Sequence, residues 1–120
     1  MVSISESQAE LEQRALCERV GSRFVSAPSL LALGISLNVR EGAIPINGLR
    51  HIPEFSTTGW YIWGGEVLST DDDFFASICV EHIADWSPTV IKYLGLAPGW
   101  RFLVAGDYED VWFDEKLLDI

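Results

Sequence analysis

The chain has 120 residues, 48% hydrophobic and 22% charged, a composition that suits one folded domain and is too apolar for a disordered segment. Its 18 acidic and 8 basic residues give a net charge of −10, and residues 59–120 hold twelve of the acids but only three of the bases. Nucleic acids and anionic membranes bind basic surfaces, so this charge argues against both and favours a basic protein partner, with solubility alone as the competing explanation.

The first half of the chain predicts helices followed by a loop-rich region. Residues 5–22 have capping serines, an apolar stripe and a terminal glycine, which predict a helix. A second, short helix is expected over residues 30–33, ended by Gly34. Apolar residues alternate over 35–39, which indicates a short strand. The glycines and prolines of residues 40–58 predict extended loop with brief strand pieces.

The middle of the second half carries mixed signals. Residues 59–65 are aromatic and β-branched with glycine at both ends, which predicts a strand. The acidic run 69–73 has the spacing of a capping box and indicates a helix entry. Interpretations compete between residues 74 and 86, where a helix fits 80–86 best. A further short helix is expected over 87–94, with proline at its first position.

The end of the chain predicts an antiparallel hairpin, formed by strands over 100–105 and 111–113 around a turn at Gly106-Asp107. Helices first and strands later indicate a single α+β domain over residues 1–120. We expect its N-terminal helices to pack on a small, mostly antiparallel sheet that ends in the hairpin.

The location of the protein is predicted from its apolar runs and cysteines. No run approaches the roughly 20 residues that span a bilayer, and the N-terminal residues have no basic region followed by an apolar stretch. Two cysteines, Cys17 and Cys79, are too few for a disulfide framework. We therefore expect a cytoplasmic protein with free thiols, and keep a single bridge as the alternative.

Few residues are spaced like metal ligands. Cys79 and His82 lie three apart, but Cys17 and His51 are distant in sequence, and one such pair is a weak zinc signal. The acidic run 71–73 lacks the glycine and the distal glutamate of a calcium loop, so helix capping is favoured. We expect neither a metal nor a cofactor.

Catalytic patterns are also weak. Glu81, His82 and Asp85 are close in sequence, but adjacent helical residues point in different directions and rarely act as a base and its orienting group. Acids available for a carboxylate pair are Glu66, Asp107, Glu109 and Asp110. No nucleophile elbow, P-loop or dinucleotide fingerprint is present, so we expect a protein that is not an enzyme. A small hydrolase that uses Glu81, His82 and clustered carboxylates is the alternative.

The aromatic residues form a distinctive set. All the tryptophans lie in the acidic half: Trp60, Trp63, Trp86, Trp100 and Trp112. In a strand over 59–65, Trp60 and Ile62 share one face, whereas Tyr61 and Trp63 share the other. Core packing of most of these rings is one interpretation. The other is a partly open face on which aromatic anchors ringed by carboxylates bind a basic protein.

Several motifs of the second half resemble a known family. They are Thr58-Gly59-Trp60-Tyr61-Ile62-Trp63, Asp73-Phe74-Phe75, Val80-Glu81-His82-Ile83, the segment from Tyr93 to Leu103 with Gly99-Trp100-Arg101-Phe102, and the segment from Gly106 to Asp114 with Tyr108-Glu109-Asp110-Val111-Trp112. In these residues the chain is similar to the bacterial family described as immunity protein thirty-three-like, whose members are proposed immunity proteins of polymorphic-toxin systems. The resemblance covers residues 45–120 well and the N-terminal helix loosely. It implies binding of a cognate toxin and supplies no catalytic residues.

Together these observations predict an immunity protein that binds a basic toxin through an acidic, aromatic surface. The residues predicted for that surface are Asp107, Tyr108, Glu109, Asp110, Trp112, Asp114 and Trp63. We expect Glu109→Lys with Asp110→Lys to weaken partner binding far more than it lowers thermal stability. A structural, oligomer-forming protein is a further alternative, and the sequence does not set the oligomeric state.

Overall fold

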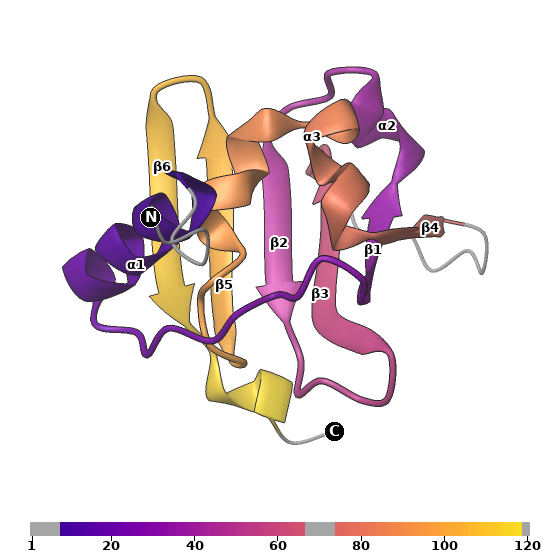
Figure 1. Ribbon diagram of the computed structural model, residues 1–120. Coiled ribbons are helices and arrows are strands. Elements are labelled where there is room, and N and C mark those ends of the chain that lie inside the picture. Colours follow the sequence, from indigo (N-terminus) through magenta and orange to yellow (C-terminus); the bar gives the residue numbers. More distant parts are fainter. Residues whose placement is uncertain (1–7, 67–73, 119–120) are drawn as a thin grey trace.

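The computed structural model describes residues 8–66 and 74–118, in which six strands form one sheet with most of the helices packed on one side (Figure 1). The strands are β1 (Ala32–Ser36), β2 (Ile46–Arg50), β3 (Thr57–Gly64), β4 (Phe75–Cys79), β5 (Trp100–Ala105) and β6 (Tyr108–Phe113). The α-helices are α1 (Gln8–Val20), α2 (Leu37–Arg40) and α3 (Ile83–Trp86). The 3₁₀ helices are η1 (Val80–His82), η2 (Pro88–Tyr93) and η3 (Glu115–Leu118). None of the helices described is long and apolar enough to cross a membrane.

The sheet has the strand order β4-β1-β3-β2-β5-β6. Strands β1 and β3 run parallel, and the other four neighbouring pairs run antiparallel. The predicted α+β class and the C-terminal hairpin are therefore confirmed, and so are the N-terminal helix and the strand over 59–65. Strands β4 and β6 form the two edges of the sheet.

The main core lies between the sheet and the helices. Alternate side chains of the central strands, among them Trp60, Ile62 and Phe102, point into it and are almost fully buried. Helix α1 and η2 close this side, and Tyr93 of η2 stacks on Phe102 with ring centroids 4.3 Å apart. We call this the helix-covered face. Cys17 is buried in the core and Cys79 is half-buried, and both are free thiols, as predicted.

An arginine holds the N-terminal segment to this core. Arg50, at the end of β2, is 1% exposed, and its guanidinium donates five hydrogen bonds to backbone carbonyl oxygens. The acceptors are Thr58 of β3, Val25 and Ser26 of the segment after α1, and Leu94 and Leu96 of the segment after η2. Three segments distant in sequence therefore meet at one side chain.

Several local predictions for the middle of the chain are wrong. Residues 30–33 do not form a helix, because residues 32–36 form β1 between β3 and β4, and its ladder bonds outweigh the local helix preference of alanine and leucine. The strand expected over 35–39 ends at residue 36 and α2 follows. Residues 46–50, in the region expected to be extended loop with brief strand pieces, form the regular strand β2. Residues 75–79 form β4 before the helical segment predicted over 80–86, and the helix entry at 69–73 lies outside the described residues.

Candidate functional site

The β5–β6 hairpin carries most of the predicted surface residues. Its turn lies at Gly106-Asp107, where glycine adopts a φ of +58°, and Asp107 is exposed. Side chains alternate along β6, so Glu109 lies on the helix-covered face, whereas Tyr108, Asp110 and Trp112 lie on the other. We call this second side the opposite face. The strand therefore divides the predicted set between the two sides of the sheet.

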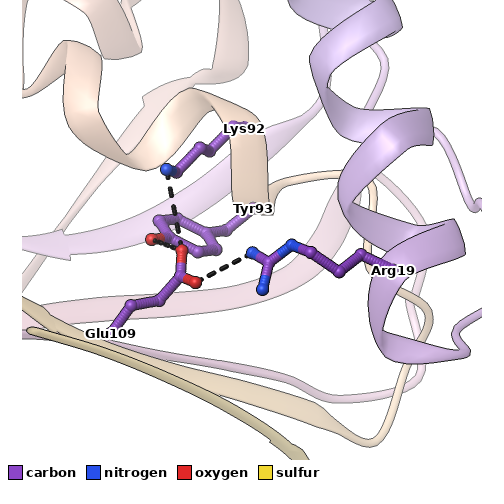
Figure 2. Close-up of polar contacts among 4 residues, drawn as sticks. All are labelled: Arg19, Lys92, Tyr93 and Glu109. Atoms are coloured by element: carbon purple, nitrogen blue, oxygen red, sulfur yellow. Dashed lines mark hydrogen bonds and ion pairs between the residues drawn. The ribbon is translucent and has the colours of Figure 1, made fainter.

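Glu109 is engaged in contacts within the chain (Figure 2). One carboxylate oxygen accepts a hydrogen bond of 2.8 Å from Arg19 of α1. The other accepts one of 2.6 Å from the hydroxyl of Tyr93 and lies 3.6 Å from the Lys92 ammonium group. The carboxylate thus ties α1 and η2 to the edge strand β6.

The protonation of this cluster follows from its geometry. The hydrogen bond from Tyr93 lowers the pKa of Glu109, and Arg19 and Lys92 act in the same direction. Burial raises the pKa of Tyr93 above its ordinary value, as does the bond to Glu109, so the phenol stays neutral and donates. An ionised carboxylate whose oxygens already face two cations and a hydroxyl is a poor general base and a poor acceptor for a partner's lysine.

The opposite face presents a row of residues that crosses all six strands. Paired neighbours in register are, in order, Ser77, Gly34, Tyr61, Leu49, Arg101 and Trp112. A second row joins Trp63, Asn47, Leu103 and Asp110. Trp63 and Asp110 thus share a face but lie three strand spacings apart, roughly 14 Å. They are not in contact.

Trp112 and Asp114 are linked through a basic side chain. The guanidinium carbon of Arg101 lies 5.5 Å from the centroid of the Trp112 ring, and its Nη1 donates to Asp114 at 3.2 Å. Asp114 also accepts from the backbone N–H of Lys116 at 3.1 Å. Asp107 and Asp110 are the exposed carboxylates of the hairpin, beside the exposed Tyr108 and the half-buried Trp112.

Trp63 belongs to a small cluster on the opposite face rather than to an exposed surface. It is 4% exposed and packs with Leu49 and Leu117, with Phe74 and Phe75 at the margin. Sequence alternation had suggested Trp63 as an anchor, but its neighbour Tyr61 is the more exposed ring, at 40%. The same alternation contained the signal for Tyr61, because the two residues share one face of the strand.

The two central residues of the alternative enzymatic interpretation, Glu81 and His82, do not line one pocket. Glu81 and His82 are exposed, 3.8 Å apart, and only Glu81 reaches a hollow of about 290 Å³ between α1 and α3. Burial raises the pKa of the Cys17 thiol, so it stays protonated and is a weak nucleophile. Within residues 8–66 and 74–118 no group of three or more His, Cys, Asp or Glu side chains is arranged to hold a metal ion.

Comparison with protein families decides the classification. The model of the Imm33-like domain matches residues 12–114, most of the sequence. The chain belongs to the Imm33-like family. No curated protein and no solved structure matches it. The matched range of the Imm33-like domain runs from α1 to the end of the hairpin, so it includes both faces of the sheet, and the family's description suggests an immunity protein.

Proposed function

We propose that this Imm33-like protein binds and neutralises a cognate toxin inside the bacterium that produces it, and that it does so without catalysis. The observation that carries the proposal is the family match over residues 12–114. An immunity protein acts by occupying a surface of its toxin, which requires an exposed recognition surface and no reactive group.

The charge of the molecule supports a basic toxin as the partner. A net charge of −10 creates a field that speeds the encounter with a positively charged protein and disfavours like-charged partners. Toxin domains that cleave nucleic acid need a basic surface for their own substrate. An acidic protein that covers such a surface blocks access to the substrate.

The contact surface is proposed to lie on the opposite face at the β5–β6 hairpin, and we call it the hairpin surface. Its members are Asp107, Tyr108, Asp110 and Trp112. The carboxylates of Asp107 and Asp110 are exposed and available to a lysine or arginine, and the rings of Tyr108 and Trp112 supply apolar area. Glu109 and Asp114 support this surface through their bonds to Arg19, Tyr93 and Arg101 rather than by contact with the toxin.

The first step of the test is to identify the toxin: we expect a gene next to that of this chain to encode a large secreted toxin, whose toxin domain is then used. Co-expression of this chain should restore growth to a host that expresses the active toxin. The purified, catalytically inactive toxin domain should bind this chain with a Kd below about 100 nM, the range of specific protein pairs. Absence of both protection and binding would refute the proposal.

A pair of matched variants tests the hairpin surface. Asp107→Lys with Asp110→Lys should weaken toxin binding at least about tenfold, mainly through a lower association rate and a loss of salt dependence. The control is Glu81→Lys with Asp85→Lys, two exposed acids near α3 that make the same change in net charge. Equal effects of the two double variants would mean that net charge, and not the hairpin surface, determines binding.

A further inference from the structure

A phenylalanine at the tip of the β2–β3 loop is fully exposed. Phe55 has a relative exposure of 103% and a φ of +48°, in the left-handed region that bulky side chains avoid. This conformation costs about 1–2 kcal/mol, and the exposed ring gains no stabilisation from burial in return. The loop nevertheless holds it firmly, since Glu54 O accepts from Thr57 N and Oγ1 at 2.9 Å and Ala32 N donates to Ser56 O at 2.8 Å.

Next to this loop, the opposite face is hollowed. A hollow of about 200 Å³ lies where β3 bulges against β1, over Gly34, with Tyr61, Phe75 and Ser77 among the side chains that line it. Gly34 lets the Tyr61 ring pack directly over the backbone of β1, because a Cβ there would lie 2.9 Å from Cδ1 of Tyr61. We call this the Tyr61 hollow. An engineered apolar cavity of about 150 Å³ holds a benzene molecule, so the hollow has room for one apolar side chain.

The Tyr61 hollow adjoins the loop and lies on the same face of the sheet as the hairpin surface. Thr57, Gly59 and Tyr61 line both it and an adjoining hollow that includes Ile52 and Glu54 of the loop. Ser77, Gly34 and Tyr61 of the hollow and Trp112 of the hairpin surface belong to the same row across the sheet. One partner can therefore contact both regions, which are separated by roughly 14 Å between β3 and β6.

We infer that the Tyr61 hollow and Phe55 are the apolar anchor of the toxin interface, an inference that rests on the proposed function. The hollow receives an apolar side chain of the toxin, and the Phe55 ring enters a pocket on the toxin surface. The charges identify the partner. Among the described residues that line the two hollows, Glu54 is the acid and there is no lysine or arginine, so the toxin residue beside its apolar anchor is a lysine or arginine.

A second copy of this chain fits the same region poorly. It would bring another Glu54 and another net charge of −10 to a surface whose two hollows have no lysine or arginine among their described lining residues. Like charges placed together at an interface cost several kcal/mol. A basic toxin has the complementary charge and is therefore the occupant.

Two variants test the anchor by opposite means. Phe55→Asn removes the ring and places at φ +48° a residue that tolerates the left-handed region, so thermal stability should stay equal or rise. Ser77→Phe fills the Tyr61 hollow from an exposed position of an edge strand. Each should raise the dissociation rate of the inactive toxin domain at least about tenfold with little change in association rate, as expected for anchor residues.

The controls make the same chemical changes elsewhere. Leu37→Asn removes an exposed apolar side chain at α2, and Thr89→Phe adds a ring at an exposed position of η2. Both should leave the dissociation rate within about twofold of wild type. Melting temperatures of all four variants separate lost binding from lost folding.

The outcomes distinguish this inference from the proposed function. If wild type binds the toxin and Asp107→Lys with Asp110→Lys weakens binding, but Phe55→Asn and Ser77→Phe do not, the anchor is refuted and the proposed function stands. If wild type does not bind the toxin, both are refuted. If light scattering shows a dimer of wild type that Phe55→Asn converts to a monomer, the occupant is a second copy and the inference is overturned.

Discussion

Replacement of Arg50 by methionine tests what holds the N-terminal segment to the sheet. The guanidinium is buried, and its five hydrogen bonds, 2.7 to 3.3 Å long, all end on backbone carbonyl oxygens. Burial lowers the pKa of Arg50 to about 10, so the group is still charged at pH 7. Methionine fills a similar volume without charge or donors, so the variant removes the bonds and the burial of charge together.

Two opposing effects set the magnitude. Removal of a buried charge relieves its desolvation, which on its own favours the variant. Against this, carbonyl groups lose a charge-assisted donor, and each buried acceptor left without a partner costs about 1–3 kcal/mol. Leu94 O still accepts from Nε1 of Trp60 at 3.0 Å, which limits the loss. We expect a net loss of about 3–5 kcal/mol, because several neutral carbonyl acceptors lose their donor while the relief of desolvation offsets part of that cost. At about 4 °C per kcal/mol, the melting temperature should fall by roughly 10–20 °C.

Urea unfolding followed by tryptophan fluorescence and far-UV circular dichroism measures this loss. Arg50→Lys keeps the charge, but its single ammonium group cannot reach carbonyl groups on three segments. Its free energy of unfolding should therefore fall as far as that of Arg50→Met, to within about 1 kcal/mol. Arg23→Met changes an exposed arginine and should shift stability by less than about 0.5 kcal/mol. A loss below about 1 kcal/mol for Arg50→Met would refute the reasoning, because desolvation of the charge would then offset the bonds.

Three further predictions concern the helix-covered face. The pKa of Glu109 is lowered in the folded state, so its ionised form stabilises the fold. This stabilisation is complete at pH values above the unfolded-state pKa of about 4.3, and it is lost as the pH falls through the lower folded-state pKa. Glu109→Gln should therefore be less stable than wild type by about 1 kcal/mol at pH 7 in urea unfolding, and a difference that persists at pH 2–3 would contradict this. Tyr93→Phe keeps the stack on Phe102 but loses the hydrogen bond to Glu109, so the free energy of unfolding should fall by about 1–2 kcal/mol. A melting temperature unchanged from wild type would contradict this. Gly48→Ala should cost about 1–3 kcal/mol in calorimetry, since its Cβ would lie 2.1 Å from the Phe102 ring, and a neutral result would mean that the ring moves freely.

The parts of the fold with strong local signals could be predicted from the sequence. The strand over 59–65 and the hairpin over 100–113 combine β-branched and aromatic residues with glycine turns, and β3, β5 and β6 lie there. Helix α1 likewise has an apolar stripe and a terminal glycine. In these segments local preference and tertiary packing agree.

Strand β2 shows why the rest could not be predicted. Its sequence contains Gly48 and Arg50, which are both poor signals for a buried central strand. Each is explained by a distant partner: Gly48 leaves room for the Phe102 ring, and Arg50 binds carbonyl groups up to 46 residues away. Strand β1 depends in the same way on β3 and β4 for its hydrogen bonds. A prediction from a short stretch of sequence around β1 or β2 does not include these distant partners.

The candidate site follows the same rule. A cluster of acids and aromatics at 107–114 was visible in the sequence, but the partners of Glu109 lie on α1 and η2, up to 90 residues away. The anchor at Phe55 and Gly34 could not be found from sequence, because its signals are a positive φ and a missing side chain beside Tyr61. Neither feature produces a pattern of residue types that can be recognised in the sequence.

The alternation of β6 separates two roles that charge alone does not distinguish. Every acid contributes to the long-range field that brings a basic protein near, whichever side of the sheet it occupies. Short-range recognition is restricted to carboxylates that can exchange water for a partner's cation, and Glu109 has already made that exchange with Arg19. Asp110, one residue along and on the opposite face, is exposed and makes no such ion pair with any residue in 8–66 or 74–118. Neighbouring acids of one strand should therefore differ in effect: loss of Glu109 should appear in folding, and loss of Asp110 in association.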